Sequence, residues 1–514
     1  MMRIILFCLS ILMELSLKDI KSFDDNYNKH PEFRVSANAL TGNNFKSIVL
    51  DNKFVNNFND VFKKVIDIDV KSTDQKGSGR CWLFAYLNVI RLKMIKKYGL
   101  DKDFELSQTF LFFYDKLEKA NYFLQFIMDN GDKEHDERIV QHFLKEPVSD
   151  GGTTNMAHNL IKKYGILPKS NMKETYQSSS TNTMNVLINQ RLRHAARDLF
   201  KNKRNRTEKF VKNVLMDIYT MLVIFLGEPP TKFNWEYYSK LSNSKDNLDD
   251  GSGKGKGKRK KGGSDTLNME NSVNVRKLSK KKKRADKRSK DSSTEKFNKY
   301  KSVQGITPVE FYEKYSDFNA DDMITLIHYP GKTINKLYNV EHSNNMVGGQ
   351  ENNYINVSID LMKILSKLSI DEDNAVWFGS DVGKYMSKSH GILDRKAFNY
   401  KDTIGFDYDM SGEDMLKYQV SSVSHAMILK GYTMNKMQMK GKNIELDIKK
   451  WLVENSWGDM TGKHGNFTMS DDWFSEFVYE IMIDKKYLSN KILKILKTKP
   501  VILPIWDPFG NLLK

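Results

Sequence analysis

The spacing of apolar residues separates the chain into a helical first half and a strand-rich second half. Apolar residues recur at intervals near 3.6 over 81–145 and again over 155–225, which is typical of helices that pack on a core. The stretch Gly165-Ile166-Leu167-Pro168 interrupts the second run and predicts a helix end. After residue 375 the apolar residues fall in short runs bounded by glycine or polar residues, and these predict antiparallel strands at 376–378, 426–429 and 451–453.

This order of elements predicts the α+β class rather than a parallel α/β sheet. Within residues 14–43 the pattern indicates a polar helix followed by an extended arm. We expect six segments: a leader or mis-called start at 1–13, an N-terminal arm and helix over 14–64, a helical half over 65–165, a helical insertion over 166–345, a sheet half over 346–500 and a tail over 501–514.

Residues 241–300 differ from the rest of the insertion in composition. They contain two lysine-rich runs, GSGKGKGKRKKGGSD and KKKKRADKRSKD, and few apolar residues between Leu248 and Phe297. Such a segment cannot bury enough apolar surface to offset the entropy lost on ordering. It therefore predicts a disordered loop, with order resuming at 307–312.

The formal net charge of +18 lies mostly in this loop. Residues 251–290 hold 16 Lys and Arg against three acidic residues, a local balance of +13 that leaves +5 for the remainder of the chain. The segment is compatible with weak nucleic-acid binding, or with a nuclear import signal at 280–288. No aromatic residue interrupts it, so bases would have nothing to stack on, and a solvated loop is the commoner interpretation.

Residues 1–13, MMRIILFCLSILM, have the outline of a secretory signal, with one basic residue before a mostly apolar run. No small-x-small cleavage site follows, and the run is shorter than the ~20 residues that a stable membrane span requires. Two interpretations stay open. Either the segment directs the protein into the secretory route, or the start codon is mis-called and Met13 is the first residue.

The composition predicts a large core and more than one subdomain, because 39% of the 514 residues are hydrophobic and 11% are aromatic. The chain has two cysteines, Cys8 and Cys81, and Cys8 lies in the leader-like segment. A disulfide scaffold is therefore excluded in practice. A reducing compartment, the cytoplasm, is the predicted location.

Cys81 is the candidate nucleophile. It follows a glycine-containing turn, and Leu83, Leu87 and Ile90 are spaced for burial, so a helix should begin at or near Cys81. The unpaired N–H groups and the dipole at a helix start favour an anion and should lower the pKa of the thiol. A lone cysteine is more often a small buried hydrophobe, so this residue type alone does not identify an active site.

Two later residues supply the groups that a cysteine nucleophile needs, a base and a side chain that orients the base. His425 begins one predicted apolar strand, and Asn455 ends another. Neighbouring strands would bring the two side chains together. A histidine on an apolar strand is more often structural, so the pair is suggestive only when it is taken with Cys81.

Taken in order, Gln-x5-Cys-Trp from Gln75, Ser-His-Ala from Ser424 and Glu-Asn-Ser-Trp-Gly from Glu454 resemble the papain family of cysteine peptidases. Within this family, the residues of these motifs are most similar to the bleomycin hydrolase branch, which includes aminopeptidase C. The resemblance covers nearly the whole chain outside 1–13 and 241–300. Further matching stretches are Asp150-Gly151-Gly152, Val376-Trp377-Phe378-Gly379, Asp381-Val382-Gly383-Lys384 and residues 307–312 and 502–510.

The sequence departs from secreted papain relatives in two ways. Ser78 stands where those enzymes have a second cysteine, which fits a branch that forms no disulfide. The 344 residues between Cys81 and His425 exceed the papain spacing more than twofold, and the extra length is the helical insertion.

The resemblance implies a papain-like fold with a large helical insertion and a cysteine aminopeptidase that acts on peptides with a free N-terminus. Cys81 would attack the scissile carbonyl, and His425, as an imidazolium, would keep the thiolate charged and then protonate the leaving amine. Asn455 would orient the His425 ring, while the Gln75 amide and the Cys81 N–H would hold the oxyanion.

Further site residues are implied in the same way. Trp457 would shield the contact between Asn455 and His425. Asp150, Gly151 and Gly152 would form the segment that pairs with the substrate backbone, because glycine allows close approach of two main chains.

The tail and the assembly are also implied by the resemblance alone. Residues 506–514 would lie in the cleft and restrict cleavage to single N-terminal residues. Leu513 would meet the substrate's α-ammonium once the enzyme has trimmed Lys514. The family resemblance implies a homohexamer whose active sites face an inner channel, and it implies no cofactor and no metal.

Overall fold

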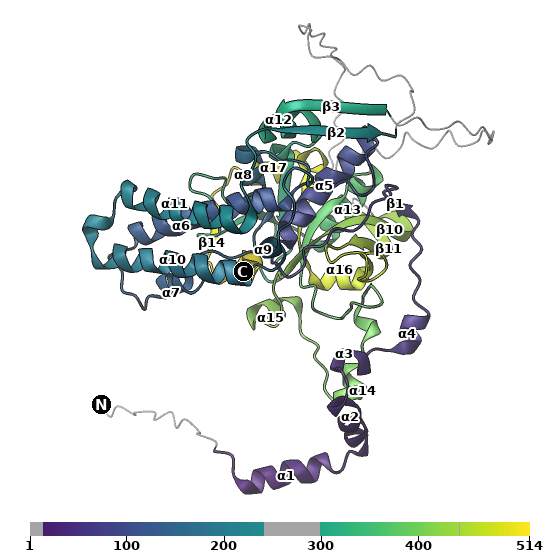
Figure 1. The fold of residues 1–514 in the computed structure, drawn as a ribbon. Helices are drawn as coiled ribbons and strands as arrows, with labels where there is room; N and C mark the ends of the chain where they lie inside the picture. Colours follow the sequence, from purple (N-terminus) through teal and green to yellow (C-terminus); the bar gives the residue numbers. More distant parts are fainter. Residues whose placement is uncertain (1–13, 241–298, 441–442, 514) are drawn as a thin grey trace, which may run out of the picture. The chain divides into compact units, whose positions relative to one another are not determined.

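The computed structural model describes residues 14–240, 299–440 and 443–513 (Figure 1). They divide into two units. One unit contains the described residues of Met1–Phe58 together with Lys396–Met410, and the other contains those of Asn59–Arg395 and Ser411–Lys514. The leader-like residues 1–13 and the basic segment 251–290, with the rest of 241–298, lie outside the described residues.

The smaller unit is built from short helices. A capping box between Ser16 and Asp19 starts the first helix, and Pro31 occupies the first turn of the second. The extended arm predicted after the first helix is wrong, because residues 31–41 are helical. The helices are α1 (Leu17–Tyr27), α2 (Pro31–Thr41), α3 (Phe45–Ile48), α4 (Asn52–Asn56) and α14 (Tyr400–Ile404).

The helices of the larger unit follow the predicted helical runs. Figure 1 shows α6, α10 and α11 side by side, and the three helices contact one another. The predicted break is confirmed, since α8 ends at Tyr164 and Gly165 follows with φ 77°. The helices are α5 (Cys81–Tyr98), α6 (Gln108–Asp129), α7 (Arg138–Lys145), α8 (Thr154–Tyr164), α9 (Tyr176–Ser179), α10 (Asn182–Lys201), α11 (Glu208–Leu226), α12 (Pro308–Tyr315), α13 (Ile359–Asp371), α15 (Gly412–Lys417), α16 (Asp471–Phe477) and α17 (Asn490–Ile495).

The main sheet has 12 strands within the described ranges, in the order β14-β5-β6-β4-β13-β7-β10-β11-β12-β9-β8, with β1 paired to β10. The strands predicted at 376–378, 426–429 and 451–453 lie in β7, β10 and β11, and their pairings are antiparallel as predicted. The bounds are β1 (Lys64–Val65), β4 (Met323–Ile327), β5 (Lys336–Val340), β6 (Asn353–Asn356), β7 (Val376–Ser380), β8 (Met386–Ser387), β9 (Ile392–Leu393), β10 (His425–Lys440), β11 (Asn443–Glu454), β12 (Asn466–Ser470), β13 (Val478–Asp484) and β14 (Val501–Leu503).

The prediction that the helical insertion runs to residue 345 needs a correction. Strands β4 and β5 lie within 166–345 but belong to the main sheet. A separate two-stranded sheet pairs β2 (Phe233–Ser239) with β3 (Lys299–Ile306), so Lys299 and Tyr300 are ordered in a strand rather than in the predicted loop. Ser239 and Lys299 face each other at the end of this pair.

The central helix of the larger unit is α5, in which almost every side chain is buried. It packs against β10 and β7 of the sheet and against α6 and α8. The Trp377 indole N–H donates to the Trp82 carbonyl at 3.2 Å and ties the start of α5 to β7. This packing places Cys81, at the start of α5, beside the start of β10. None of the described helices is both long and apolar enough to cross a membrane.

One buried acid in the sheet has no polar partner. Glu480 of β13 is fully buried, and neither carboxylate oxygen has a hydrogen-bond partner among the described residues. The side chain lies against Gly379 of β7, where an added Cβ would sit 3.4 Å from Oε2. Burial raises the pKa of Glu480 to about 8, so the carboxyl is neutral at neutral pH.

Candidate active site

Cys81 is the first residue of α5, which confirms the predicted helix start. The side chain is only 5% exposed, and the sulfur accepts a hydrogen bond from the backbone N–H of Ala426, the second residue of β10. The thiol is therefore held directly beside the residue that follows His425 along the strand.

His425 and Asn455 are brought together by the antiparallel pairing of β10 with β11. His425 is the first residue of β10 and Asn455 follows the last residue of β11, as predicted. The His425 Nε2–H donates to Asn455 Oδ1 at 2.8 Å, and the Ser456 backbone N–H donates to the same oxygen at 2.8 Å. The second bond fixes the amide orientation. With Nε2–H engaged, Nδ1 is the ring nitrogen left to accept a proton.

Trp457 packs against the His425 ring. Its ring stacks on the His425 ring with centroids 4.7 Å apart and planes 29° from parallel. The Lys388 ammonium lies 4.9 Å from the centre of the Trp457 ring. The indole therefore limits access of water to the imidazole.

The predicted lowering of the thiol pKa needs a correction. Burial is the largest influence and raises the pKa of Cys81 to about 11, although the backbone N–H groups of Ala426, Trp82 and Cys81 lower it. Burial also lowers the pKa of His425 to about 4, against the hydrogen bond to Asn455, which raises it. Both shifts favour a neutral thiol and a neutral imidazole at neutral pH.

Gln75 is tied to the segment that follows Asn455. Its Oε1 accepts from Ser456 Oγ at 2.7 Å, and its backbone N–H donates to the Ser456 carbonyl at 2.8 Å. One Nε2–H donates to the Ser78 carbonyl at 2.7 Å. A primary amide has two such donors, so the other N–H is available to an oxyanion.

Asp150 joins the residues before the nucleophile to the helical insertion. Its carboxylate accepts from Lys116 Nζ at 2.6 Å, Asn185 Nδ2 at 2.8 Å and the Gly79 N–H at 3.1 Å. Burial alone would raise the pKa of Asp150, but the Lys116 ammonium and the hydrogen bonds outweigh burial and hold it well below the usual range. The carboxylate therefore stays charged and fixes the turn.

The two glycines after Asp150 differ in what surrounds them. The Gly151 carbonyl accepts a hydrogen bond from the buried Lys119 ammonium. A Cβ on Gly152 would lie 2.5 Å from the Trp82 ring, so packing inside the protein already requires glycine there. The absence of a Cβ at Gly152 is thus explained without a substrate.

The tail approaches the site from two sides. The Leu513 carbonyl accepts from Ser149 Oγ, next to Asp150, and Asn511 Nδ2 donates to Ser422 Oγ at 2.8 Å, shortly before His425. The Phe509 ring stacks on Tyr329 with centroids 4.5 Å apart. Leu513 and Ser149 line a cavity of about 260 Å³ together with Lys119, Tyr122 and Phe143.

Sequence reasoning missed several residues of this site. Ser456, Lys116 and Ser149 bind Gln75, Asp150 and Leu513, respectively. One signal was present, since Lys116 stands among apolar residues of a predicted helix. Within the described ranges, no cluster of His, Cys, Asp or Glu could hold a metal ion.

Comparison with known proteins agrees with this geometry. The family described as Peptidase C1-like matches residues 14–252 and 286–510. Aminopeptidase C of Listeria monocytogenes is 34% identical over 97% of this chain and 99% of its own length, and human bleomycin hydrolase is 32% identical over 97% and 98%. The crystal structure of PepW from Lactobacillus rhamnosis HN001, 32% identical, matches with a TM-score of 0.80 over 97% of this chain and 99% of PepW. The predicted resemblance and the papain-like α+β fold are confirmed.

Proposed function

The chain belongs to the peptidase C1-like family and is a cysteine-type aminopeptidase, and we propose that Cys81, His425, Asn455 and Gln75 form its catalytic site. The observation that carries the proposal is the hydrogen bond between the His425 ring and Asn455, next to a thiol at the start of α5. A cysteine nucleophile requires this arrangement of a base and a group that orients it.

The reaction begins from the neutral pair. His425 Nδ1 accepts the thiol proton while the sulfur bonds to the scissile carbonyl carbon, and the carbonyl oxygen becomes an oxyanion. The free Nε2–H of Gln75 and the Cys81 backbone N–H stabilise that charge. The C–N bond then breaks, and the His425 imidazolium gives its proton to the leaving amine.

The acyl-enzyme is hydrolysed by the same groups in reverse roles. His425 takes a proton from water, the resulting hydroxide adds to the thioester carbonyl, and the C–S bond breaks to release the amino acid. The thiol recovers its proton from His425. Asn455 keeps the ring oriented in both steps, and Trp457 keeps water from competing for Nε2–H.

Asp150, Gly151 and Gly152 would bind the substrate main chain. Two buried ammonium groups bind this segment. Lys116 donates to the Asp150 carboxylate, and Lys119 donates to the carbonyls of Ser149 and Gly151. Ammonium groups bound to these carbonyls fix the direction of the peptide planes. The segment is therefore a rigid edge against which an extended peptide can lie.

The tail would restrict cleavage to single N-terminal residues, and its hydrogen bonds to Ser149, next to Asp150, and to Ser422, shortly before His425, support this role. Deleting residues 511–514 should allow cleavage of internal bonds in an N-acetylated peptide that the full chain leaves intact. Strict aminopeptidase specificity after the deletion would exclude the tail as the specificity element.

The catalytic roles are tested by single substitutions. Cys81→Ala should abolish turnover of an aminoacyl-fluorogenic substrate with unchanged circular dichroism, because alanine is compatible with the start of a helix. His425→Ala should be nearly as severe, and Asn455→Ala milder, because the base is still present. Turnover by the Cys81→Ala protein above that of a mock preparation would reject the mechanism.

A cytoplasmic homohexamer is the assembly that the family resemblance supports. Cys81 is a free, buried cysteine, which suits a reducing compartment. Sedimentation velocity of the purified protein tests the hexamer, and N-terminal sequencing of the native protein distinguishes the cytoplasm from the secretory route. Binding of single-stranded DNA with and without residues 251–290 tests the nucleic-acid alternative.

A further inference from the structure

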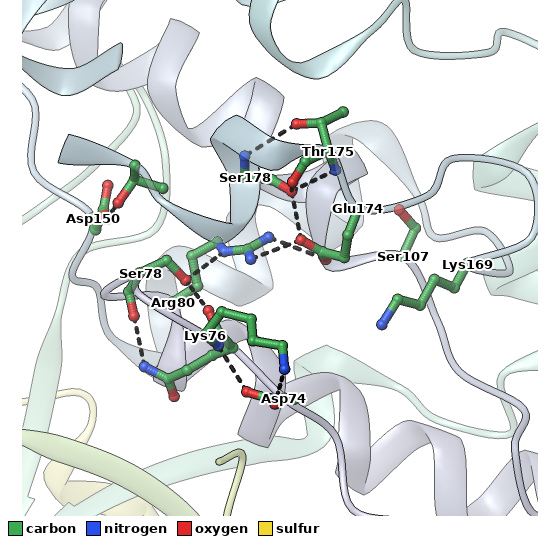
Figure 2. A network of polar contacts seen from close by, with 12 residues as sticks. Asp74, Lys76, Ser78, Arg80, Ser107, Asp150, Lys169, Glu174, Thr175 and Ser178 are labelled. Carbon is green, nitrogen blue, oxygen red and sulfur yellow. Dashed lines mark hydrogen bonds and ion pairs between the residues drawn. The ribbon is translucent and has the colours of Figure 1, made fainter. Parts of the chain in front are cut away.

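Arg80, the residue before the nucleophile, is fully buried in an unusual setting. Its guanidinium forms two parallel hydrogen bonds with Glu174, Nη1 to Oε1 at 3.2 Å and Nη2 to Oε2 at 2.8 Å (Figure 2). The same group lies 5.1 Å from the Phe84 ring centre and 5.2 Å from that of Phe112. A bidentate pair between aromatic rings fixes both side chains in one geometry.

Glu174 lies in the helical insertion, just before α9. Ser178 Oγ donates to Glu174 Oε2 at 2.6 Å, inside the first turn of α9. Burial alone would raise the pKa of Glu174, but the Arg80 guanidinium and the Ser178 hydroxyl outweigh burial and lower it. The Gly77 N–H also donates to the Ser179 carbonyl at 2.9 Å. The segment is therefore bonded to the turn before Cys81 at both Gly77 and Arg80.

The Nε–H of Arg80 connects the guanidinium, through Ser78, to Gln75, the proposed oxyanion donor. Arg80 Nε donates to Ser78 Oγ at 2.9 Å, and Ser78 Oγ donates to the Gln75 carbonyl at 2.6 Å. The Ser78 carbonyl accepts the Gln75 Nε2–H at 2.7 Å. A chain of hydrogen bonds thus runs from Glu174 through Arg80 and the Ser78 hydroxyl to the Gln75 backbone carbonyl, and the Ser78 main chain holds the Gln75 side-chain amide, as Figure 2 shows in part.

The turn from Gln75 to Arg80 needs such support. Lys76 has φ 53°, in the left-handed region that residues with a Cβ adopt at a cost, and glycines occupy positions 77 and 79. A turn of this kind has other accessible conformations. The stabilisation of an oxyanion depends on donors placed within tenths of an ångström before the reaction starts.

We propose that Arg80 and Glu174 are positioning residues that act through Ser78 to set the Gln75 amide for the oxyanion. The helical insertion, which supplies Glu174, then takes part in transition-state stabilisation. The inference rests on the proposed role of Gln75 in the oxyanion hole.

Ser78→Ala is the main test, because it removes the link from Arg80 to Gln75 and leaves no charge without a partner. It should lower kcat for an aminoacyl substrate by roughly 10- to 100-fold with little change in KM, since a misplaced donor weakens binding of the transition state only. Arg80→Lys keeps a charge beside Glu174 but lacks the Nε–H, and should have the same effect. The matched control is Arg191→Lys on α10 of the helical insertion. Arg191 donates two hydrogen bonds to Asp217, and the variant should retain full activity.

Two further readouts separate a misplaced amide from a damaged nucleophile. An amino aldehyde forms a tetrahedral adduct with Cys81 and needs the oxyanion hole, so its inhibition constant should rise by the same factor as kcat/KM falls. Alkylation of Cys81 by iodoacetamide generates no oxyanion, and its rate should stay within a few-fold. Loss of alkylation in proportion to kcat would assign Ser78 and Arg80 to the thiol, and would overturn the inference.

A double-mutant cycle with Gln75→Ala completes the test. If Arg80 acts through Gln75, Ser78→Ala should cost nothing further in the Gln75→Ala background. Full additivity of the two substitutions would overturn the inference and leave the role of Gln75 intact. A Gln75→Ala protein with unchanged kcat would instead overturn the proposed oxyanion hole itself.

Discussion

Replacing Glu480 by glutamine should change how the free energy of unfolding depends on pH. The pKa of Glu480 is raised by burial from an ordinary 4.5 to about 8 in the folded protein. Between these values the unfolded chain has lost the proton and the folded chain has kept it. Stability from this group is therefore complete below pH 4.5 and is lost as the pH rises through 8.

The size of the effect follows from the shift. Each pH unit in this window lowers the free energy of unfolding by about 1.4 kcal/mol, and the whole window amounts to about 5 kcal/mol. Glutamine cannot ionise and has nearly the same volume. The stability of Glu480→Gln relative to the natural chain should thus increase steadily as the pH rises from 4.5 to 8.

The assay is the urea concentration at half-unfolding, measured by pulse proteolysis at several pH values in this window and converted with a common m value. Glu228→Gln, at an exposed position, is the matched control for loss of one glutamate. Parallel pH dependences for Glu480→Gln and the natural chain would refute the reasoning, because they would mean that Glu480 ionises alike in both states.

Three other predictions concern the site and the hairpin. kcat/KM should fall as the pH drops through about 4, because His425 must be neutral to take the thiol proton, and a fall near 6.5 would contradict this. Asn455→Ala should move that fall to lower pH, because the hydrogen bond to Asn455 raises the His425 pKa and its removal lowers the pKa. A shift to higher pH would argue against the contact. Replacing residues 240–298 by Asn-Gly should keep peptidase activity within a few-fold, because this turn closes the Ser239 and Lys299 pair. Loss of activity would assign the replaced residues a part in catalysis.

The site residues could be predicted where chemistry coincides with the end of a secondary-structure element. Cys81 at a helix start, and His425 and Asn455 at strand ends, each follow from local patterns. The pKa of the Cys81 thiol could not be predicted, because burial by distant segments raises this pKa more than the N–H groups at the helix start lower it. Arg80 and Glu174 are 94 positions apart, and no local pattern indicates that they meet.

The errors in the fold have a similar origin. Residues 31–41 are polar enough to suggest an arm, but Pro31 at the helix start and packing on α14 make them helical. Strands β4 and β5 are short and lie after a long helical stretch, so their membership of the main sheet depends on pairing with β13 and β6, which local patterns do not reveal.

The proposed catalytic centre draws its parts from both ends of the chain, since the Gln75 amide is bonded to Ser456, 381 positions later, and the Cys81 thiol is 344 positions before the proposed base, His425. A ribosome adds roughly 5 to 20 residues per second, so the base is translated about 20 to 70 s after the thiol. During that interval the nascent chain carries a nucleophile without a base or an oxyanion hole. The order of the elements therefore delays assembly of the proposed site until synthesis is nearly complete.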